Sequence, residues 1–96
     1  MTVPRRYGPV PDVAFPATWL VDNGRVRRRI TLPDFASALR LVVAIGAEAE
    51  LLGHHPDLTF GWGYLEISCQ TQSTGGLTDA DVTLVHAIDR VLAPHG

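Results

Sequence analysis

The fold depends on one stretch, Glu50-Leu51-Leu52-Gly53-His54-His55-Pro56-Asp57, in which a long apolar helix should end and a strand should begin. Gly53 is a natural helix terminator, and a proline disfavours helical backbone for the residue before it, so His55 should be extended or in a turn. If the last helical turn reaches His54, Glu50 lies four residues back on the same face and can fix the tautomer of that imidazole or raise its basicity. This corner is therefore a candidate acid/base site.

The residues before the corner have the period of an amphipathic helix. Asp34 can cap a helix that begins at Phe35. Apolar or small residues then recur at the three- and four-residue spacing of one helical face; they are Phe35, Ala38, Leu39, Val42, Ile45, Gly46, Ala49 and Leu52. A second, weaker stripe of Leu41, Ala44 and Leu51 leaves surplus apolar surface, which another subunit could bury.

Two short strands should precede this helix. The segments 19–21 and 25–32 flank Asp22-Asn23-Gly24, a strong hairpin signal. In the second segment Arg28 shares the apolar face, and the arginine cluster Arg25, Arg27 and Arg29 occupies the opposite face. We interpret this cluster as a solvated sheet face; an anion or partner site is the alternative.

The second half of the chain repeats the strand, strand, helix order. Residues 58–60 and a strand from Tyr64 to Gln70 flank a Gly-Trp-Gly segment, which predicts another antiparallel pair. Thr78 and Asp81 approximate a capping box at the start of the last helix. The sequence thus predicts an α+β fold of order β-β-α-β-β-α, with an antiparallel four-stranded sheet and both helices on one face. The open sheet face should favour dimerisation.

Composition favours one domain. With 96 residues and 46% hydrophobic content, the chain can bury roughly 60 to 70% of its unfolded surface in a modest core. We assign residues 19–96 to that domain and residues 1–18 to an extended arm, because its four prolines oppose a continuous helix.

Charge and cysteine content limit the partners and the compartment. A net charge of −2 gives no general reason to expect nucleic acid or an anionic membrane as partner. The single cysteine, Cys69, excludes an intrachain disulfide, and no stretch approaches the ~20 apolar residues of a membrane span, so we expect a soluble, cytoplasmic protein. The spacing of the histidines and Cys69 matches no common metal motif, and His86 is interpreted as a helix-surface residue.

Several of these residues together resemble a known family. Glu50, His54-His55-Pro56, the aromatic Trp62 and Asp81 are similar in order and spacing to the signature of pterin-4a-carbinolamine dehydratases, and the resemblance extends back to Trp19. It implies an α+β fold whose subunits pair through their sheets as homodimers or homotetramers. It also implies a hydro-lyase reaction, the loss of water from 4a-hydroxytetrahydropterin to give quinonoid dihydropterin during tetrahydropterin recycling, without a metal or organic cofactor.

The resemblance also implies roles for these residues. His54 matches the general acid, His55 the residue that orients the pterin, and Glu50 their carboxylate support. Trp62 would line the ring site, and Asp81 matches the family's aspartate at the start of the last helix. Expelling the 4a-hydroxyl needs a proton donor, and imidazoles titrate near neutral pH.

One position departs from the family pattern. Gln72 stands where the family usually carries a second catalytic histidine in a Thr-His pair, and glutamine cannot deliver a proton at neutral pH. Two functions therefore fit. The first is a dehydratase in which His54 does most of the proton transfer; the alternative is a non-catalytic binding protein on the same scaffold, such as the dehydratase-like factors that assist Rubisco assembly in carboxysomes or those that stabilise transcription-factor dimers.

Overall fold

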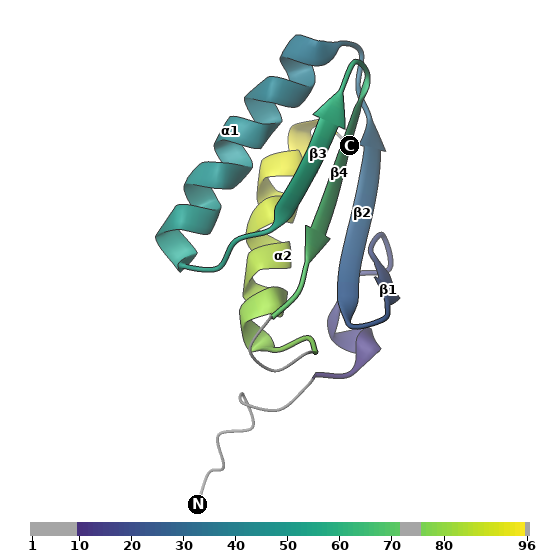
Figure 1. Cartoon of the computed structure of the whole chain (residues 1–96), viewed down its shortest axis with the longest axis vertical. Coiled ribbons are helices and arrows are strands. Elements are labelled where there is room, and N and C mark those ends of the chain that lie inside the picture. The colour runs from purple at the N-terminus through teal and green to yellow at the C-terminus, as the bar shows by residue number, and fades with distance from the viewer. Residues whose placement is uncertain (1–9, 72–75, 96) are drawn as a thin grey trace, which may run out of the picture.

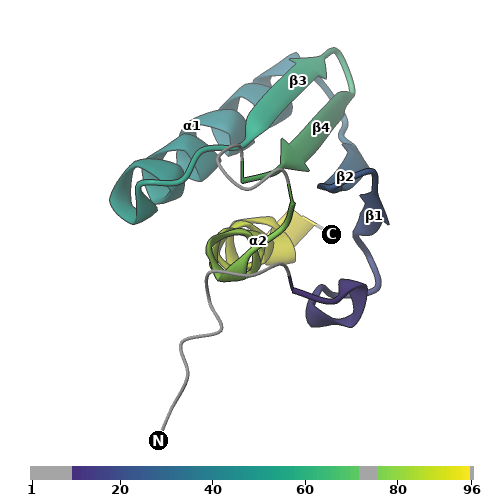
Figure 2. The same cartoon turned by 60° about the horizontal axis from the view of Figure 1, so that its bottom comes forward.

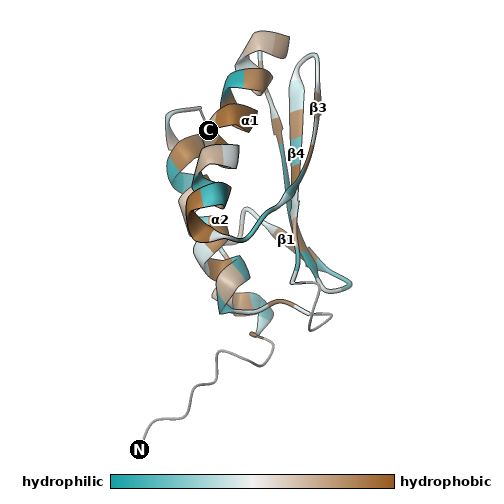
Figure 3. Ribbon diagram, turned by 60° about the vertical axis from the view of Figure 1, so that its left-hand side comes forward, coloured by the Kyte–Doolittle hydropathy of each residue, from teal (hydrophilic) through white to brown (hydrophobic). Residues whose placement is uncertain are grey.

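The computed structural model describes residues 10–71 and 76–95 (Figure 1). Its strands are β1 (Leu20–Asp22), β2 (Arg25–Thr31), β3 (Asp57–Gly61) and β4 (Tyr64–Cys69), and its helices are α1 (Phe35–Leu52) and α2 (Asp79–Leu92). The strands form one antiparallel sheet in the order β1-β2-β4-β3. Both helices cover the same side of the sheet and leave the other side open (Figure 3). The predicted α+β architecture is confirmed.

The β1–β2 hairpin closes through the predicted Asn-Gly turn. Asn23 has φ 51° and Gly24 has φ 75°. Positive φ at both central residues is the signature of a type I′ turn, whose twist matches that of the flanking strands. The turn therefore sets the register in which Val21 faces Val26.

The ends of α1 are those that the sequence indicates. The backbone N–H of Ser37 donates to Oδ1 of Asp34 at 2.8 Å, and hydrogen bonding from Ser37 lowers the pKa of Asp34. At the other end Gly53 adopts a left-handed conformation with φ 69°. The helix consequently ends at Leu52 and does not reach His54.

The buried stripe of α1 differs from the predicted one. The core residues of the helix are Ala38, Leu41, Ile45 and Ala49, so Leu41 belongs to the core although we placed it on the weaker stripe. Phe35, Leu39 and Leu52 are exposed, which makes that part of the prediction wrong. The reason is that α1 contacts α2 as well as β3 and β4, which rotates its buried arc toward α2.

The outer face of the sheet is polar, not bare. Arg27 pairs with Asp22 at 3.1 Å, Arg25 lies 3.6 Å from Asp57, and Arg29 pairs with Glu66. A hollow of about 300 Å³ on this face is lined by Thr59 and Ser68 together with some of these charged residues. The solvated-face interpretation of the arginine cluster fits this charge pairing.

Arg28 is the inward arginine of β2, as its alternation predicts. Its Nη1 donates to Oδ1 of Asp89 on α2 at 3.0 Å, and Nε1 of Trp19 donates to the same oxygen at 2.9 Å. This network ties β2 and the segment before β1 to α2.

Part of the N-terminal arm packs on the domain. Asp12–Ala14 forms a short 3₁₀ turn, and α2 lies between this turn and α1 (Figure 2). Phe15 and Trp19 are buried in the same core. The division of the chain at residue 18 stays a prediction, but the core extends back at least to Phe15.

Cys69 is a core residue, as predicted. Burial, followed by the negative charges of Asp81 and Asp57, raises the pKa of its thiol to about 12. The helices in the described ranges include none that is long and apolar enough to cross a membrane.

Candidate active site

The His-His-Pro corner joins the end of α1 to β3. The backbone N–H groups of Gly53 and His54 both donate to the carbonyl of Ala49, at 2.9 and 3.3 Å, and so close the helix end. Beyond this closure the two imidazoles take different partners. Nε2 of His54 lies 2.7 Å from Oδ1 of Asp81, and Nε2 of His55 lies 2.5 Å from Oε2 of Glu50.

The expected pairing of Glu50 with His54 is therefore wrong. Because α1 ends at Leu52 and the left-handed Gly53 turns the chain, His54 does not continue the helical face that carries Glu50. Glu50 supports His55 instead, and His54 turns inward to the first turn of α2.

The two pairs differ strongly in burial. The side chains of His54 and Asp81 are 19% and 0% exposed, whereas those of His55 and Glu50 are 58% and 77% exposed. An exposed ion pair is screened by water and contributes little, whereas a buried carboxylate needs donors to compensate for lost hydration. The His54 pair is consequently the one that the fold holds in place.

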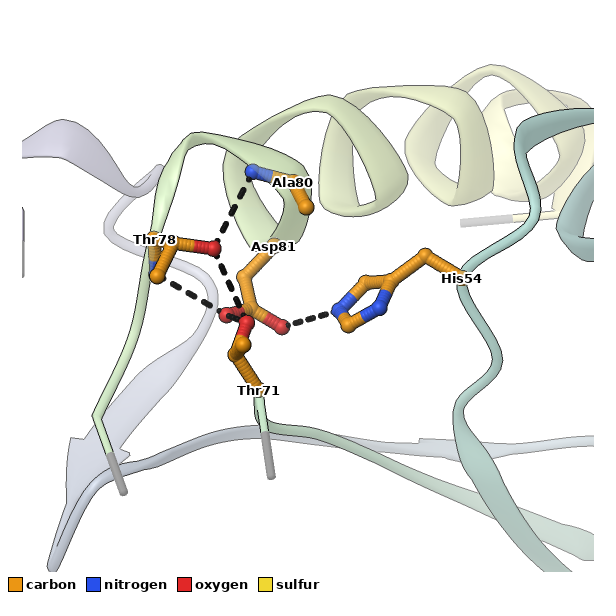
Figure 4. Close-up of polar contacts among 5 residues, drawn as sticks. All are labelled: His54, Thr71, Thr78, Ala80 and Asp81. Carbon is orange, nitrogen blue, oxygen red and sulfur yellow. Dashed lines mark hydrogen bonds and ion pairs between the residues drawn. The ribbon is translucent and has the colours of Figure 1, made fainter. Parts of the chain in front are cut away.

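Asp81 has donors on both oxygens (Figure 4). Its Oδ2 accepts from the hydroxyl of Thr71 at 2.5 Å and from the backbone N–H of Thr78 at 3.0 Å, while Oδ1 faces His54. The contact with Thr78 is one half of a capping box, as predicted for the start of α2. One carboxylate thus caps a helix and holds an imidazole.

Thr71 and Thr78 belong to this network, although neither was predicted as a site residue. Their hydroxyl oxygens lie 2.9 Å apart, and Thr71 follows β4 by two residues. Thr71 directly precedes Gln72 and so corresponds to the threonine of the family's Thr-His pair. That correspondence is the sequence signal that could have identified Thr71. Its contact with Asp81 depends on tertiary packing, which local spacing does not reveal.

Trp62 lies far from the histidines of its own chain. It is 75% exposed in the turn between β3 and β4, and the histidines precede β3, so the length of the strand separates them (Figure 1). A five-residue strand spans ~15 Å. A role for Trp62 at a ring site stays a prediction, and it would require a second copy of the chain.

The other candidates do not join this cluster. Gln72 lies outside the described residues, and His86 is exposed on α2. Within residues 10–71 and 76–95, no three His, Cys, Asp or Glu side chains gather as a metal site would require.

Comparison with known proteins identifies the family of this chain. A family model described as pterin 4 alpha carbinolamine dehydratase matches residues 12–91. The chain belongs to this family. Relatives named "Putative pterin-4-alpha-carbinolamine dehydratase" occur in Azoarcus sp. strain BH72 and Aromatoleum aromaticum, each 42% identical, over 79% and 82% of this chain and 66% and 70% of theirs. Another in Roseiflexus sp. strain RS-1 is 36% identical over 77% of this chain and 80% of its own.

Two solved structures share the fold. One is a transcriptional coactivator/pterin dehydratase from Brucella melitensis, with a TM-score of 0.77, 20% identity and coverage of 88% of this chain and 98% of that one. The other is a pterin dehydratase-like protein described as a RuBisCO assembly factor in the alpha-carboxysome, with a TM-score of 0.62, 20% identity and coverage of 76% and 84%. At 20% identity, each likeness shows a shared fold only.

Proposed function

We propose that this protein is a 4a-hydroxytetrahydropterin dehydratase, a hydro-lyase that acts in tetrahydropterin recycling. The observation that carries the proposal is the His54–Asp81 pair, an imidazole hydrogen-bonded at one ring nitrogen to a carboxylate with no exposed surface. An imidazole held in this way is suited to general acid catalysis, because its orientation is set before the substrate binds. Membership of the family supplies the substrate class.

The reaction asks for proton transfers alone. The 4a-hydroxyl takes a proton from the protonated imidazole of His54, the carbon–oxygen bond breaks, and water leaves. A ring N–H of the pterin then gives a proton to the neutral imidazole, which restores its protonated form. No electrons are exchanged with another molecule, so acid/base groups are sufficient for the chemistry.

His55 and Glu50 have a different place in the proposal. Their pair is exposed at the same corner, so the imidazole of His55 can rotate toward a bound ring. We assign His55 to orienting the pterin and Glu50 to supporting His55, while Asp81 supports His54.

A second function is favoured by Gln72. The absence of the second imidazole removes one proton donor that the family usually has, and one general acid typically contributes ~10² to 10⁴ in rate. A pterin- or protein-binding role on the same scaffold, with Rubisco as one candidate partner, is therefore the alternative. The RuBisCO assembly factor that shares the fold supports this alternative.

Stopped-flow measurement of 4a-hydroxytetrahydropterin dehydration, with and without the full chain, separates these functions. We expect clear acceleration over buffer. A chain that quenches pterin fluorescence on binding but leaves the dehydration rate unchanged would support the binding role. If the chain neither accelerates dehydration nor binds pterin, a protein-binding role becomes the better proposal.

We also propose that the chain forms a homodimer or homotetramer. Apolar side chains are exposed at every fourth position along α1, at Phe35, Leu39, Val43 and Leu51 with Ala47 between the last two. A ridge of this spacing is the kind that packs into the groove of another helix. Residues of this size are costly to leave in water, so a second copy of α1 is the partner that we infer.

Light scattering at micromolar concentration tests the assembly. We expect a mass of at least two chains for the native protein and of one chain for Val43→Glu. Thr83→Glu on the exposed face of α2 is the matched control and should keep the native mass. A native protein that is monomeric under these conditions contradicts the proposal.

A further inference from the structure

The ring nitrogens of His54 are not equivalent. Nε2 lies 2.7 Å from Oδ1 of Asp81, and Figure 4 shows the other ring nitrogen, Nδ1, pointing away from that carboxylate. A carboxylate only accepts hydrogen bonds, so this contact places a proton on Nε2. In the neutral imidazole the nitrogen without a proton is then Nδ1.

The carboxylate of Asp81 is held in one orientation toward the imidazole of His54. Its Oδ2 receives the hydroxyl of Thr71 and the backbone N–H of Thr78, which leaves Oδ1 for His54. The side chain has no exposed surface, so bulk water does not compete for its oxygens. Rotation of the carboxylate would break the helix cap as well as the bond to Thr71.

The His55–Glu50 pair provides an internal contrast. It also joins an imidazole Nε2 to a carboxylate oxygen, but both side chains are mostly exposed and either can turn toward water. The physical expectation is a strong tautomer preference for His54 and a weaker one for His55.

From these contacts we infer that Asp81, held by Thr71, locks His54 in the Nε2–H tautomer and makes Nδ1 the atom that exchanges protons with the substrate. The second half of this inference rests on the proposed function. In the protonated ring both nitrogens carry a proton; Nδ1 gives its proton to the 4a-hydroxyl oxygen as the carbon–oxygen bond breaks, which leaves the neutral Nε2–H tautomer, and a pterin ring N–H then returns a proton to Nδ1. Nε2 keeps its proton throughout. Asp81 and Thr71 are positioning residues, because they act through His54.

The tautomer can be read directly by NMR. Long-range ¹H–¹⁵N correlation of the full chain, with ¹⁵N-labelled histidine and at a pH where the imidazoles are neutral, reports which ring nitrogen carries the proton. We expect a preference of about tenfold or more for Nε2–H at His54, because hydrogen bonds to charged groups are the stronger ones. Observation of the Nδ1–H form at His54 would overturn the inference.

Asp81→Asn is the decisive variant. The amide keeps an oxygen for the N–H of Thr78 and can turn its NH₂ toward Nε2, which favours the opposite tautomer. We expect His54 to shift toward Nδ1–H and the dehydration rate to fall by ~10² to 10⁴, as when a general acid is lost. Asp79→Asn removes the same charge from the same helical turn and should change neither readout. An Asp81→Asn protein that folds and keeps the Nε2–H tautomer contradicts the assignment.

Thr71 supplies a milder test that also serves if Asp81→Asn does not fold. Thr71→Val should keep the Nε2–H tautomer and slow dehydration about fivefold, since one hydrogen bond to the carboxylate is lost. Thr71→Ser should restore the rate, because it keeps the hydroxyl. Failure of serine to rescue valine would remove Thr71 from the positioning role.

The two readouts separate this inference from the proposed function. An Nε2–H tautomer that depends on Asp81 in a protein that does not accelerate dehydration supports the lock and overturns the proton transfer through Nδ1. Dehydration that proceeds with His54 as Nδ1–H overturns the lock and leaves the dehydratase function standing.

Discussion

Two histidine–carboxylate pairs start from neighbouring residues of the same corner, yet they are physically different. The His55–Glu50 distance of 2.5 Å is shorter than the His54–Asp81 distance of 2.7 Å. Distance alone would make the His55–Glu50 contact the stronger of the two. Burial reverses the ranking, because Asp81 is enclosed by three donors, whereas Glu50 can exchange its partner for water. The network around a contact therefore says more about its function than its length does.

The largest difference between the pairs is expected in catalysis. His54→Ala should lower turnover by ~10² or more, because it removes the proton donor, whereas His55→Ala should mainly raise KM. Steady-state dehydration kinetics on both variants measure this split. His86→Ala on the exposed face of α2 is the control and should behave as the native chain does. Equal losses of turnover in His54→Ala and His55→Ala would break the distinction between the pairs.

A further catalytic prediction concerns Gln72, where a histidine would add a third imidazole. With one donor, the two 4a epimers of the substrate should be dehydrated unequally, since His54 reaches the hydroxyl from one face of the ring. Gln72→His should accelerate the slow epimer by up to ~10² and leave the fast one nearly unchanged. Stopped-flow traces with both epimers resolve the two phases. Equal epimer rates in the native chain would show that glutamine is no handicap.

Stability should separate the two carboxylates by a smaller amount. Asp81→Ala removes a capping interaction and the carboxylate that accepts from Thr71 and faces His54, so unfolding should become easier by about 2 to 3 kcal/mol. Glu50→Ala should change the free energy of unfolding by less than about 0.5 kcal/mol, since its pair is exposed. Urea unfolding of both variants measures the difference. A comparable loss in both would mean that burial does not distinguish the pairs.

The smallest effect is expected at Cys69. Burial, followed by the charge of Asp81 and then that of Asp57, holds its pKa at about 12 in the folded chain, above the ordinary value of 9.0. The folded state therefore binds more protons between these values, and stability should fall as the pH rises above 9. We expect a loss of about 1 to 2 kcal/mol by pH 10.5 in urea unfolding that is absent from Cys69→Ala.

The same experiment bears on the comparison of the carboxylates. Because Asp81 is among the causes of the raised pKa, Asp81→Asn should reduce the alkaline loss, whereas Glu50→Gln should not. An alkaline loss that persists in Cys69→Ala would have another origin.

Residues that act on their immediate neighbours were predicted well. Asp34 caps the start of α1 and Gly53 ends it, Asn23-Gly24 closes the first hairpin, and Thr78 with Asp81 starts α2. Each of these depends on backbone conformations and hydrogen bonds within a few residues, which are properties of short stretches of sequence. The histidine corner itself was also visible, because glycine and proline restrict the backbone around it.

The hydrogen-bond partner of His54 was not predicted. We expected Glu50 to serve His54 because helical spacing is the only proximity that a linear pattern offers, but α1 ends at Leu52, two residues before His54, where the left-handed Gly53 turns the chain. Asp81 lies 27 residues from His54, and they meet because α2 packs beside α1. The same packing selects Leu41 over Leu39 for the core. Turns, caps and element order thus follow from local chain chemistry, whereas the choice of which imidazole is buried against which carboxylate depends on the packing of elements that are distant in sequence.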